Sequence, residues 1–326
     1  MKRVTSLIIT AVLLLLASAL PPIPFPVKTY DFVFVLDITR SMNVQDYNDA
    51  NGSAISRLEK AKAAMLDVVR ELPCGSRLGL AIFTERVPAL LYSPVETCAD
   101  YPVIKASINH LDWRMAWVAD SNINQALYNT LELMEYPMLS RSKLVFFTDG
   151  QEAPPINPRY APDYSYIDLL HHRDNDWSAG LIVGVGQHEL SRIPKFDEDG
   201  IQIGFYTAED VPHASNFGLP EDPSKIEGYV PRNGPWGTEK IVGTEHLSSV
   251  RETYLKQLAE QAKMHYHHLD SSTALSQAIQ QPYFAEREIQ PTRMNGLLAA
   301  FALLFLLHCY HPFRHKWPLS TYRQIQ

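Results

Sequence analysis

The chain has 326 residues, of which 20% are charged and 46% hydrophobic, and its formal net charge is −7. These values are ordinary for a globular protein, and the length allows one large domain or two small ones. The sequence contains no long run of Lys or Arg. Because phosphate binding needs a concentrated basic surface, the composition argues against nucleic acid as a partner.

The N-terminus begins with a short basic flank and an apolar run. Lys2 and Arg3 precede residues 4–20, which are apolar apart from Thr and Ser. This pattern is typical of an export signal or a signal anchor, so we expect a transmembrane helix in residues 1–20. Ala17-Ser18-Ala19 resembles a cleavage site, and both a cleaved signal and a retained anchor remain open. The Pro-rich residues 21–29 predict an extended spacer.

Residues 30–282 alternate short apolar runs with amphipathic segments. In chain order we expect strand 31–36, helix 55–72, strand 77–84, a short edge strand at 88–93, helices 107–111 and 122–136, strands 143–148 and 179–186, helix 250–263, strand 265–269 and helix 272–281, capped by Ser271 or Ser272. This alternation is the signature of a doubly wound sheet. The sequence therefore predicts an α/β domain with a mostly parallel six-stranded sheet, helices on both faces and one antiparallel edge strand.

Two long segments, 151–178 and 187–245, interrupt this alternation and hold much of the Pro, Gly, Asp and His. Loops of such length are usually functional or disordered. Ligands of doubly wound sheets gather at the carboxyl ends of the strands. We therefore expect both inserted loops to lie at or near that edge of the sheet.

A second apolar run, 296–310, lies near the C-terminus and is followed by basic residues. It predicts a transmembrane helix over 294–311 and a cytoplasmic tail over 312–326, although a buried or interfacial helix is the alternative. Basic residues flank both apolar runs on the same side, which places both ends in the cytoplasm and residues 21–293 outside it.

Two of the three cysteines, Cys74 and Cys98, lie in the exported part, 24 positions apart and in loop-like contexts. An oxidising compartment permits a disulfide between them, and two free thiols are the alternative. The third, Cys309, lies within the second apolar run.

Oxygen-bearing side chains follow two of the predicted buried strands. Asp37, Thr39 and Ser41 come directly after strand 31–36, and Asp149 follows strand 143–148. Two carboxylates and two hydroxyls form a hard-oxygen site suited to Mg²⁺, Ca²⁺ or Mn²⁺ rather than Zn²⁺. The alternative is that Asp37 and Ser41 only cap turns, as these residue types often do.

The run FVFVLDITRSM resembles the opening of a von Willebrand factor A domain, whose D-x-S-x-S signature begins a metal-ion-dependent adhesion site. Thr39 stands where the first Ser of that signature is usual. The family's third loop carries a Thr in T-N-I-x-x-A-L, and here Ser121 opens SNINQAL. Asp149 in VFFTDG matches the last ligand. The resemblance thus implies five metal ligands, with hydroxyl exchanges at Thr39 and Ser121.

The resemblance also implies a function in recognition: a partner's Asp or Glu carboxylate would complete the coordination of the metal. We expect binding and not catalysis. The matched motif contains no general base, and neither a G-x-S-x-G nucleophile elbow nor a glycine-rich phosphate loop is present.

The chain is further similar to bacterial membrane-anchored A-domain proteins, which implies an inner-membrane protein with a periplasmic domain. The run FFTDGQEAPP resembles accessory proteins encoded beside methanol dehydrogenase. Their implied role is assembly or calcium loading of that enzyme, often alongside a MoxR-type AAA+ ATPase. The segment after the fifth strand resembles the Bat aerotolerance proteins, and a Bat-type envelope-stress scaffold or adhesion protein is therefore the alternative.

Three histidines and two tryptophans are weaker candidates for functional residues. His265, His267 and His268 could ligate a transition metal, but no carboxylate or Cys with zinc-site spacing accompanies them, and surface histidines are the simpler interpretation. Trp113 and Trp117 flank the Ser121 loop and are either partly buried or an exposed contact surface.

Overall fold

The computed structural model describes residues 2–118, 120–154, 161–165, 180–211, 244–292 and 295–310. The predicted tail 312–326 and much of both inserted loops lie outside the described residues. The chain divides into two compact units. One is Lys28–Glu286, and the other joins the two ends of the chain, Met1–Val27 and Arg287–Gln326.

The larger unit contains a six-stranded sheet in the order β13-β8-β7-β2-β5-β6. Parallel pairing joins all neighbours except β5 and β6, which are antiparallel. The strands are β2 (Asp31–Asp37), β5 (Arg77–Thr84), β6 (Val87–Glu96), β7 (Lys143–Thr148), β8 (Gly180–Gly184) and β13 (His265–His268). The predicted α/β fold with a mostly parallel six-stranded sheet is confirmed, and the antiparallel edge strand is β6.

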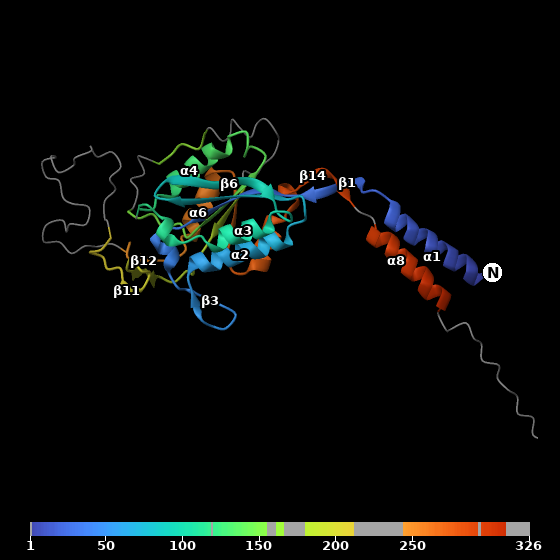
Figure 1. Ribbon diagram of the computed structural model, residues 1–326. Coiled ribbons are helices and arrows are strands. Elements are labelled where there is room, and N and C mark those ends of the chain that lie inside the picture. Colours follow the sequence, from blue (N-terminus) through green and yellow to red (C-terminus); the bar gives the residue numbers. More distant parts are fainter. Residues whose placement is uncertain are drawn as a thin grey trace, which may run out of the picture. The chain divides into compact units, whose positions relative to one another are not determined.

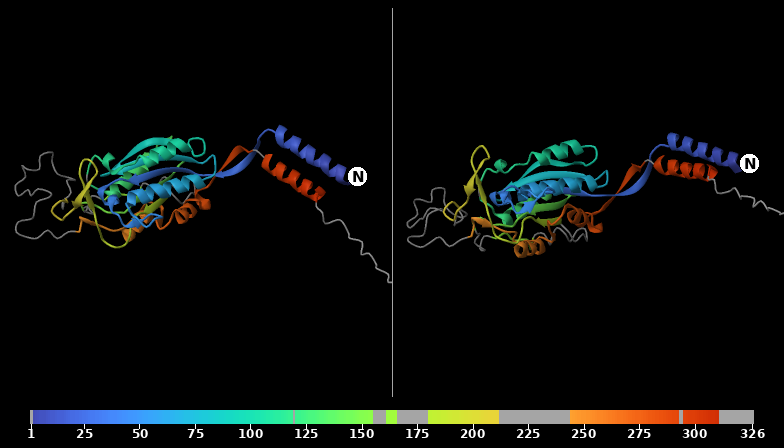
Figure 2. Two further views of the ribbon diagram at one scale, coloured as in Figure 1. Left: turned by 60° about the horizontal axis from the view of Figure 1, so that its bottom comes forward. Right: turned by 90° about the horizontal axis from the view of Figure 1, so that it is seen from below.

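Helices cover both faces of this sheet (Figures 1 and 2). Side chains of the central strand β2 alternate between the two faces. Phe32 and Phe34 belong to one apolar cluster, and Val33 and Val35 belong to the other. All four side chains are fully buried. Each such burial contributes about 1.5–3 kcal/mol, so the continuous apolar run fixes β2 in the centre of the sheet.

The first cluster packs against α2 (Arg57–Glu71), α3 (Tyr101–Asn109) and α7 (Ser272–Ile279), and the second against α4 (Ile123–Met134) and α6 (Glu252–Gln261). Ser56 caps α2 and Ser271 caps α7, each through its side-chain oxygen. Helix α3 begins six residues before the predicted position. Its apolar stripe consists of Ile104 and Ile108, and Pro at the first turn favours an early start.

The inserted segment 187–245 contains three short strands that the sequence pattern did not predict: β9 (Ser191–Arg192), β10 (Pro194–Phe196) and β11 (Gln202–Phe205). A fourth unpredicted strand, β12 (Leu247–Ser248), follows this segment. Strands β10 and β11 form an antiparallel hairpin, the yellow ribbon in Figure 2. Another short hairpin, β3 (Tyr47–Asn48) with β4 (Ala54–Ile55), precedes α2.

The two segments predicted as transmembrane helices contain helices α1 (Lys2–Ala19) and α8 (Asn295–Tyr310). They lie side by side, and Ser6 Oγ donates a hydrogen bond to the Phe305 carbonyl at 3.1 Å. Within the part of the chain that the structure describes, no helix combines the length and apolar character needed to cross a membrane. The Pro-rich segment 21–29, predicted as an extended spacer, contains strand β1 (Ile23–Thr29), which pairs with β14 (Glu286–Thr292).

Candidate metal centre

The candidate site lies at the carboxyl edge of the sheet, where two neighbouring strands end. Asp37 is the last residue of β2, and Asp149 directly follows β7. Both carboxylates are fully buried. The Asp37 Oδ1 accepts the backbone N–H of Thr39 at 2.8 Å, and its Oδ2 accepts the Thr148 hydroxyl at 2.6 Å. The parallel register thus brings together two acids that are 112 positions apart in the sequence.

Thr39 and Ser41 lie in the turn that leaves β2. A 3₁₀ turn, Arg40–Asn43, begins after Thr39 and folds the two hydroxyls toward one another at 3.4 Å. Both residues are at least 95% buried. Alternate positions of this turn therefore direct oxygen atoms into one small polar space.

Backbone pairing holds Ser121 at the same edge. It bridges Glu85, just after β5, on one side and Ala153, in the loop after Asp149, on the other. Its N–H donates to the Ala153 carbonyl at 2.7 Å, and the Ala153 N–H donates back at 2.9 Å. The Ser121 Oγ is buried and has no hydrogen-bond partner among the described residues. Such an atom is costly to bury unless a ligand or water satisfies it.

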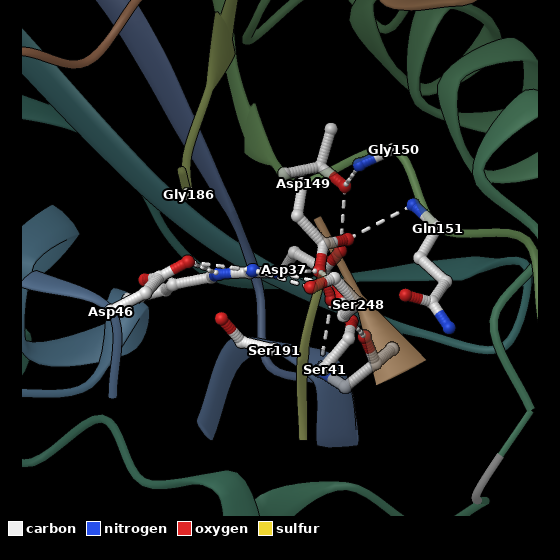
Figure 3. A network of polar contacts seen from close by, with 12 residues as sticks. Asp37, Ser41, Asp46, Asp149, Gly150, Gln151, Gly186, Ser191 and Ser248 are labelled. Atoms are coloured by element: carbon white, nitrogen blue, oxygen red, sulfur yellow. Dashed lines mark hydrogen bonds and ion pairs between the residues drawn. The ribbon is translucent and has the colours of Figure 1, made fainter. Parts of the chain in front are cut away.

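Asp149 differs from Asp37 because a guanidinium is among the protein groups that contact its carboxylate (Figure 3). Its Oδ1 accepts the Gln151 backbone N–H at 2.9 Å. Its Oδ2 accepts Arg57 Nη1 at 2.7 Å and the Ser248 hydroxyl at 2.9 Å. The predicted ligand is thus also one partner of a buried ion pair.

Arg57, whose side chain is fully buried, links Asp149 to a second acid. Its Nε and Nη2 donate to Asp46 Oδ2 at 2.9 and 2.7 Å, and its Nη2 also donates to the Ser248 carbonyl at 3.2 Å. Gly186 lies against the guanidinium, with φ near +127°, and a Cβ at that position would lie 2.7 Å from Arg57 Nε. A side chain at position 186 would therefore collide with Arg57, and glycine leaves the room that the guanidinium needs.

The buried acids make the site electrostatically unfavourable on its own. Burial raises the pKa of Asp37 above its usual range, and the negative charge of Asp149 raises it as well. Hydrogen bonds from Thr148 and Thr39 oppose this rise. A cation placed between hydroxyls and carboxylates would relieve the repulsion between these acids and would satisfy the Ser121 hydroxyl. The donor set therefore fits a hard divalent ion.

A third acid, Glu152, supports the loop that carries Ser121. Its carboxylate accepts the backbone N–H groups of Ile123 and Asn124 at 2.9 and 3.0 Å, at the start of α4, and also the Tyr254 hydroxyl. Burial raises the pKa of Glu152 to about 7, and these hydrogen bonds oppose the rise. Glu152 thus joins the Asp149 loop, the first turn of α4 and α6.

The sequence reasoning found Asp37, Thr39, Ser41, Ser121 and Asp149, and the structure places them at one edge of the sheet. It missed Arg57, Asp46, Thr148 and Ser248. One signal could have revealed Arg57, because it stands four residues before Ala61 on the apolar stripe of α2. A charge on a buried helix face needs a partner. Asp46 lies in an irregular segment and Ser248 in the two-residue strand β12, and neither gave a comparable signal.

The histidines considered as ligands of a transition metal do not form a metal-binding group among the described residues. His265 stacks on Tyr283, and His268 contacts Asp270 and the Gly186 carbonyl. Within the described residues, no group of acidic, His and Cys side chains places these histidines around a common point. Asp197 accepts the backbone N–H groups of Asp199 and Ile201 and so caps the turn between β10 and β11.

Cys74 and Cys98 form a disulfide, on the side of the sheet where β5 begins and β6 ends. Glu96 accepts backbone N–H groups from Gly75 and Ala99 beside it. The cysteines therefore fasten an edge of the sheet away from the candidate metal ligands.

Fold and site together define an α/β domain with an oxygen-rich site at the carboxyl edge of a six-stranded sheet. Residues 32–151 match the von Willebrand factor type A domain family, and the chain therefore contains a von Willebrand factor type A domain. No curated protein sequence matches the chain.

Solved structures of low sequence identity resemble this chain. An aerotolerance-related membrane protein from Bacteroides fragilis is 16% identical and has a TM-score of 0.48, over 78% of this chain and 98% of that one. The conserved hypothetical protein BatB from Bacteroides thetaiotaomicron is 18% identical with a TM-score of 0.48, over 77% and 95% of the two chains.

Proposed function

We propose that the domain binds a divalent cation, Mg²⁺ or else Ca²⁺ or Mn²⁺, and uses it to capture a carboxylate of a protein partner. Asp37, Thr39, Ser41 and Ser121 would hold the ion, with Asp149 contributing negative charge beside them. The observation that carries the proposal is the buried Ser121 hydroxyl, which has no protein partner among the described residues although its backbone is bonded on both sides. When bound, the ion supplies an electron-poor centre that attracts an anion.

The chain's own residues orient the two acids of the site. The Thr39 N–H and the Thr148 hydroxyl hold the Asp37 carboxylate in one orientation. Arg57 fixes Asp149 and compensates part of its charge. With that charge partly compensated, Asp37 is the principal uncompensated acid of the site, and a bound divalent ion retains net positive charge for a partner's Asp or Glu. The function is thus recognition and not catalysis.

We propose a periplasmic location, with α1 and α8 attaching the domain to the bacterial inner membrane. The disulfide supports export, because such bonds persist in oxidising compartments. Exposed apolar side chains on the paired helices support membrane attachment, for example Leu15, which is 68% exposed, and Leu304, which is 60% exposed. Fractionation of cells that express the full chain should recover it with inner membranes, with its domain cut by protease added from the periplasmic side. Recovery in the soluble fraction would contradict this location.

The proposed client is a periplasmic metalloenzyme such as methanol dehydrogenase, assembled with help from a MoxR-type AAA+ ATPase; a Bat-type scaffold without a single enzyme client is the alternative. The test is capture of purified dehydrogenase by the full chain in detergent. Capture should require Mg²⁺ or Ca²⁺ and should be lost with EDTA or with Asp37→Ala. Capture that persists under both conditions would overturn the metal-bridge function. Failure to capture the dehydrogenase, with metal binding intact, would exclude only this client.

A further inference from the structure

A groove of ≈ 510 Å³ lies beside the metal-binding turn, within the size range of protein ligand pockets. Three chain segments line it. Ile38 and Arg40 come from the turn after β2, a second wall comes from residues within 113–118, and the third comes from the hairpin β10–β11 and Tyr206.

The groove and the candidate metal centre share one turn of the chain. Asp37, Thr39 and Ser41 supply oxygen atoms to the centre, and the intervening Ile38 and Arg40 line the groove. The second wall leads directly into the Ser121 loop. A polypeptide whose carboxylate reached the metal would therefore extend along this groove.

Four aromatic residues line the groove: Trp113, Trp117, Phe196 and Tyr206. The rings of Trp113 and Phe196 stack with their centres 5.4 Å apart, and the Arg40 guanidinium lies 5.0 Å above the ring of Tyr206. Trp117 remains 52% exposed. Aromatic pairs hold one another in place, whereas an exposed indole in a groove offers a face to a partner's side chain.

Charges around the groove are distributed unevenly. The Arg114 guanidinium contacts both carboxylate oxygens of Asp112 at 2.8 and 2.9 Å, and Lys195 contacts Asp210 at 2.8 Å. These ion pairs compensate the charges of Arg114 and Lys195. Within the part of the chain that the structure describes, Arg40 has no such acidic partner, and next to the metal ligands it adds positive charge at the end of the groove where a carboxylate would bind.

Two acids, Asp197 and Glu198, also line the groove, on the hairpin that forms its third wall. Asp197 is engaged in the turn of that hairpin through two backbone N–H groups. The groove is therefore positive at the Arg40 end, aromatic along its walls and acidic on the hairpin. This order disfavours a second acidic side chain in the groove and leaves an apolar one as the better occupant.

We propose that this groove binds an aromatic side chain of the same partner segment whose carboxylate binds the metal. The inference rests on the proposed function and deepens it, because it names the recognition element: an acidic residue with an aromatic residue about one to three positions away, at roughly 3.3 Å per residue in an extended segment. The metal supplies attraction for any carboxylate, and the aromatic groove selects among the segments that carry one.

The test uses the full chain in detergent and fluorescein-labelled Gly/Ser peptides. One set carries Asp with Trp one, two or three positions to either side, and the controls carry Asp alone, Trp alone, or Asn with Trp. Fluorescence anisotropy is measured in Mn²⁺ and in EDTA, and metal occupancy is followed separately by the Mn²⁺ paramagnetic resonance signal. The best Asp–Trp peptide should bind at least about tenfold more tightly than Asp alone, and only with Mn²⁺.

The double variant Trp117→Ala/Tyr206→Ala should lose this gain and keep Mn²⁺ binding, whereas Tyr136→Ala, at an exposed Tyr beyond the end of α4, should keep both. Equal binding of all Asp peptides would overturn the groove and leave the metal function standing. Trp peptides that bind without Asp or Mn²⁺ would also overturn it. Mn²⁺ bound without any Asp-dependent binding, or no Mn²⁺ bound at all, would overturn the proposed function together with the groove.

Discussion

The two sides of the candidate metal centre differ in how far protein atoms satisfy their oxygens. On the Asp149 side, a buried guanidinium, a serine hydroxyl and a backbone N–H occupy both carboxylate oxygens. On the hydroxyl side, Thr39 and Ser41 contact one another at 3.4 Å, and the Ser121 hydroxyl has no partner among the described residues. One side is a fixed scaffold and the other is prepared for a ligand, so mutations on the two sides should separate stability from metal binding.

On the scaffold side, replacing Arg57 should cause the largest loss of stability. Arg57→Met removes the charge that pairs with Asp46 and Asp149 and leaves two buried acids without their cation. We expect a loss of about 3–5 kcal/mol in the free energy of unfolding, measured by urea denaturation with circular dichroism. The control is Arg70→Met on the same helix, whose solvent-exposed ion pair with Asp67 should contribute little to stability. Similar losses in both variants would refute a scaffold centred on Arg57.

Glu152 connects the two sides and should make stability depend on pH. Its pKa is about 7 in the folded protein against a usual value of 4.5, so the folded state retains a proton that the unfolded chain releases. The resulting stabilisation is present below about pH 4.5 and is lost as the pH rises through 7. Glu152→Gln should remove this decline, on the order of 2–3 kcal/mol, from metal-free unfolding curves taken between pH 5 and 8. The exposed Glu71→Gln should leave the decline unchanged, and an equal effect of both would contradict the assignment.

The ligand side should show the opposite behaviour at Asp37. Asp37→Asn keeps the shape of the side chain and removes the carboxylate charge at the end of β2. We expect the affinity for Mn²⁺ to fall by at least about tenfold to a hundredfold, the range that changes near a metal site commonly cause. Calorimetric titration measures this affinity. An unchanged affinity in a folded variant would exclude Asp37 as a ligand.

The smallest effects are expected at two buried serines, Ser121 and Ser248, and should differ in kind between them. Ser121→Ala removes a hydroxyl with no protein partner among the described residues, so we expect little change in metal-free stability and a several-fold loss of Mn²⁺ affinity. Ser248→Ala removes the hydroxyl that contacts Arg57 and Asp149, so we expect a loss of about 1–2 kcal/mol in stability and little change in affinity. Urea denaturation and calorimetry on both variants check the pair. The reverse pattern would show that the scaffold and ligand sides have been assigned to the wrong residues.

The sequence predicted the architecture of the domain because its central strands are buried on both faces. Continuous apolar runs such as 31–36 and 143–148 admit few other structures, and their neighbours at helical spacing predict the covering layers. Once those strands are taken as parallel, their carboxyl ends meet at one edge. The positions of Asp37 and Asp149 could therefore be inferred without coordinates.

Tertiary structure alone decided which oxygens of that site are already satisfied. Arg57 is 92 positions from Asp149 and 191 from Ser248, and the sequence spacing does not show which acids a guanidinium will contact. The groove likewise depends on the hairpin β10–β11, whose short strands have no clear periodicity. The sequence by itself thus determined where a cation could bind, because strand order follows from local pattern. Only the folded structure decided which part of the site remains available to a ligand, because that depends on contacts between distant segments.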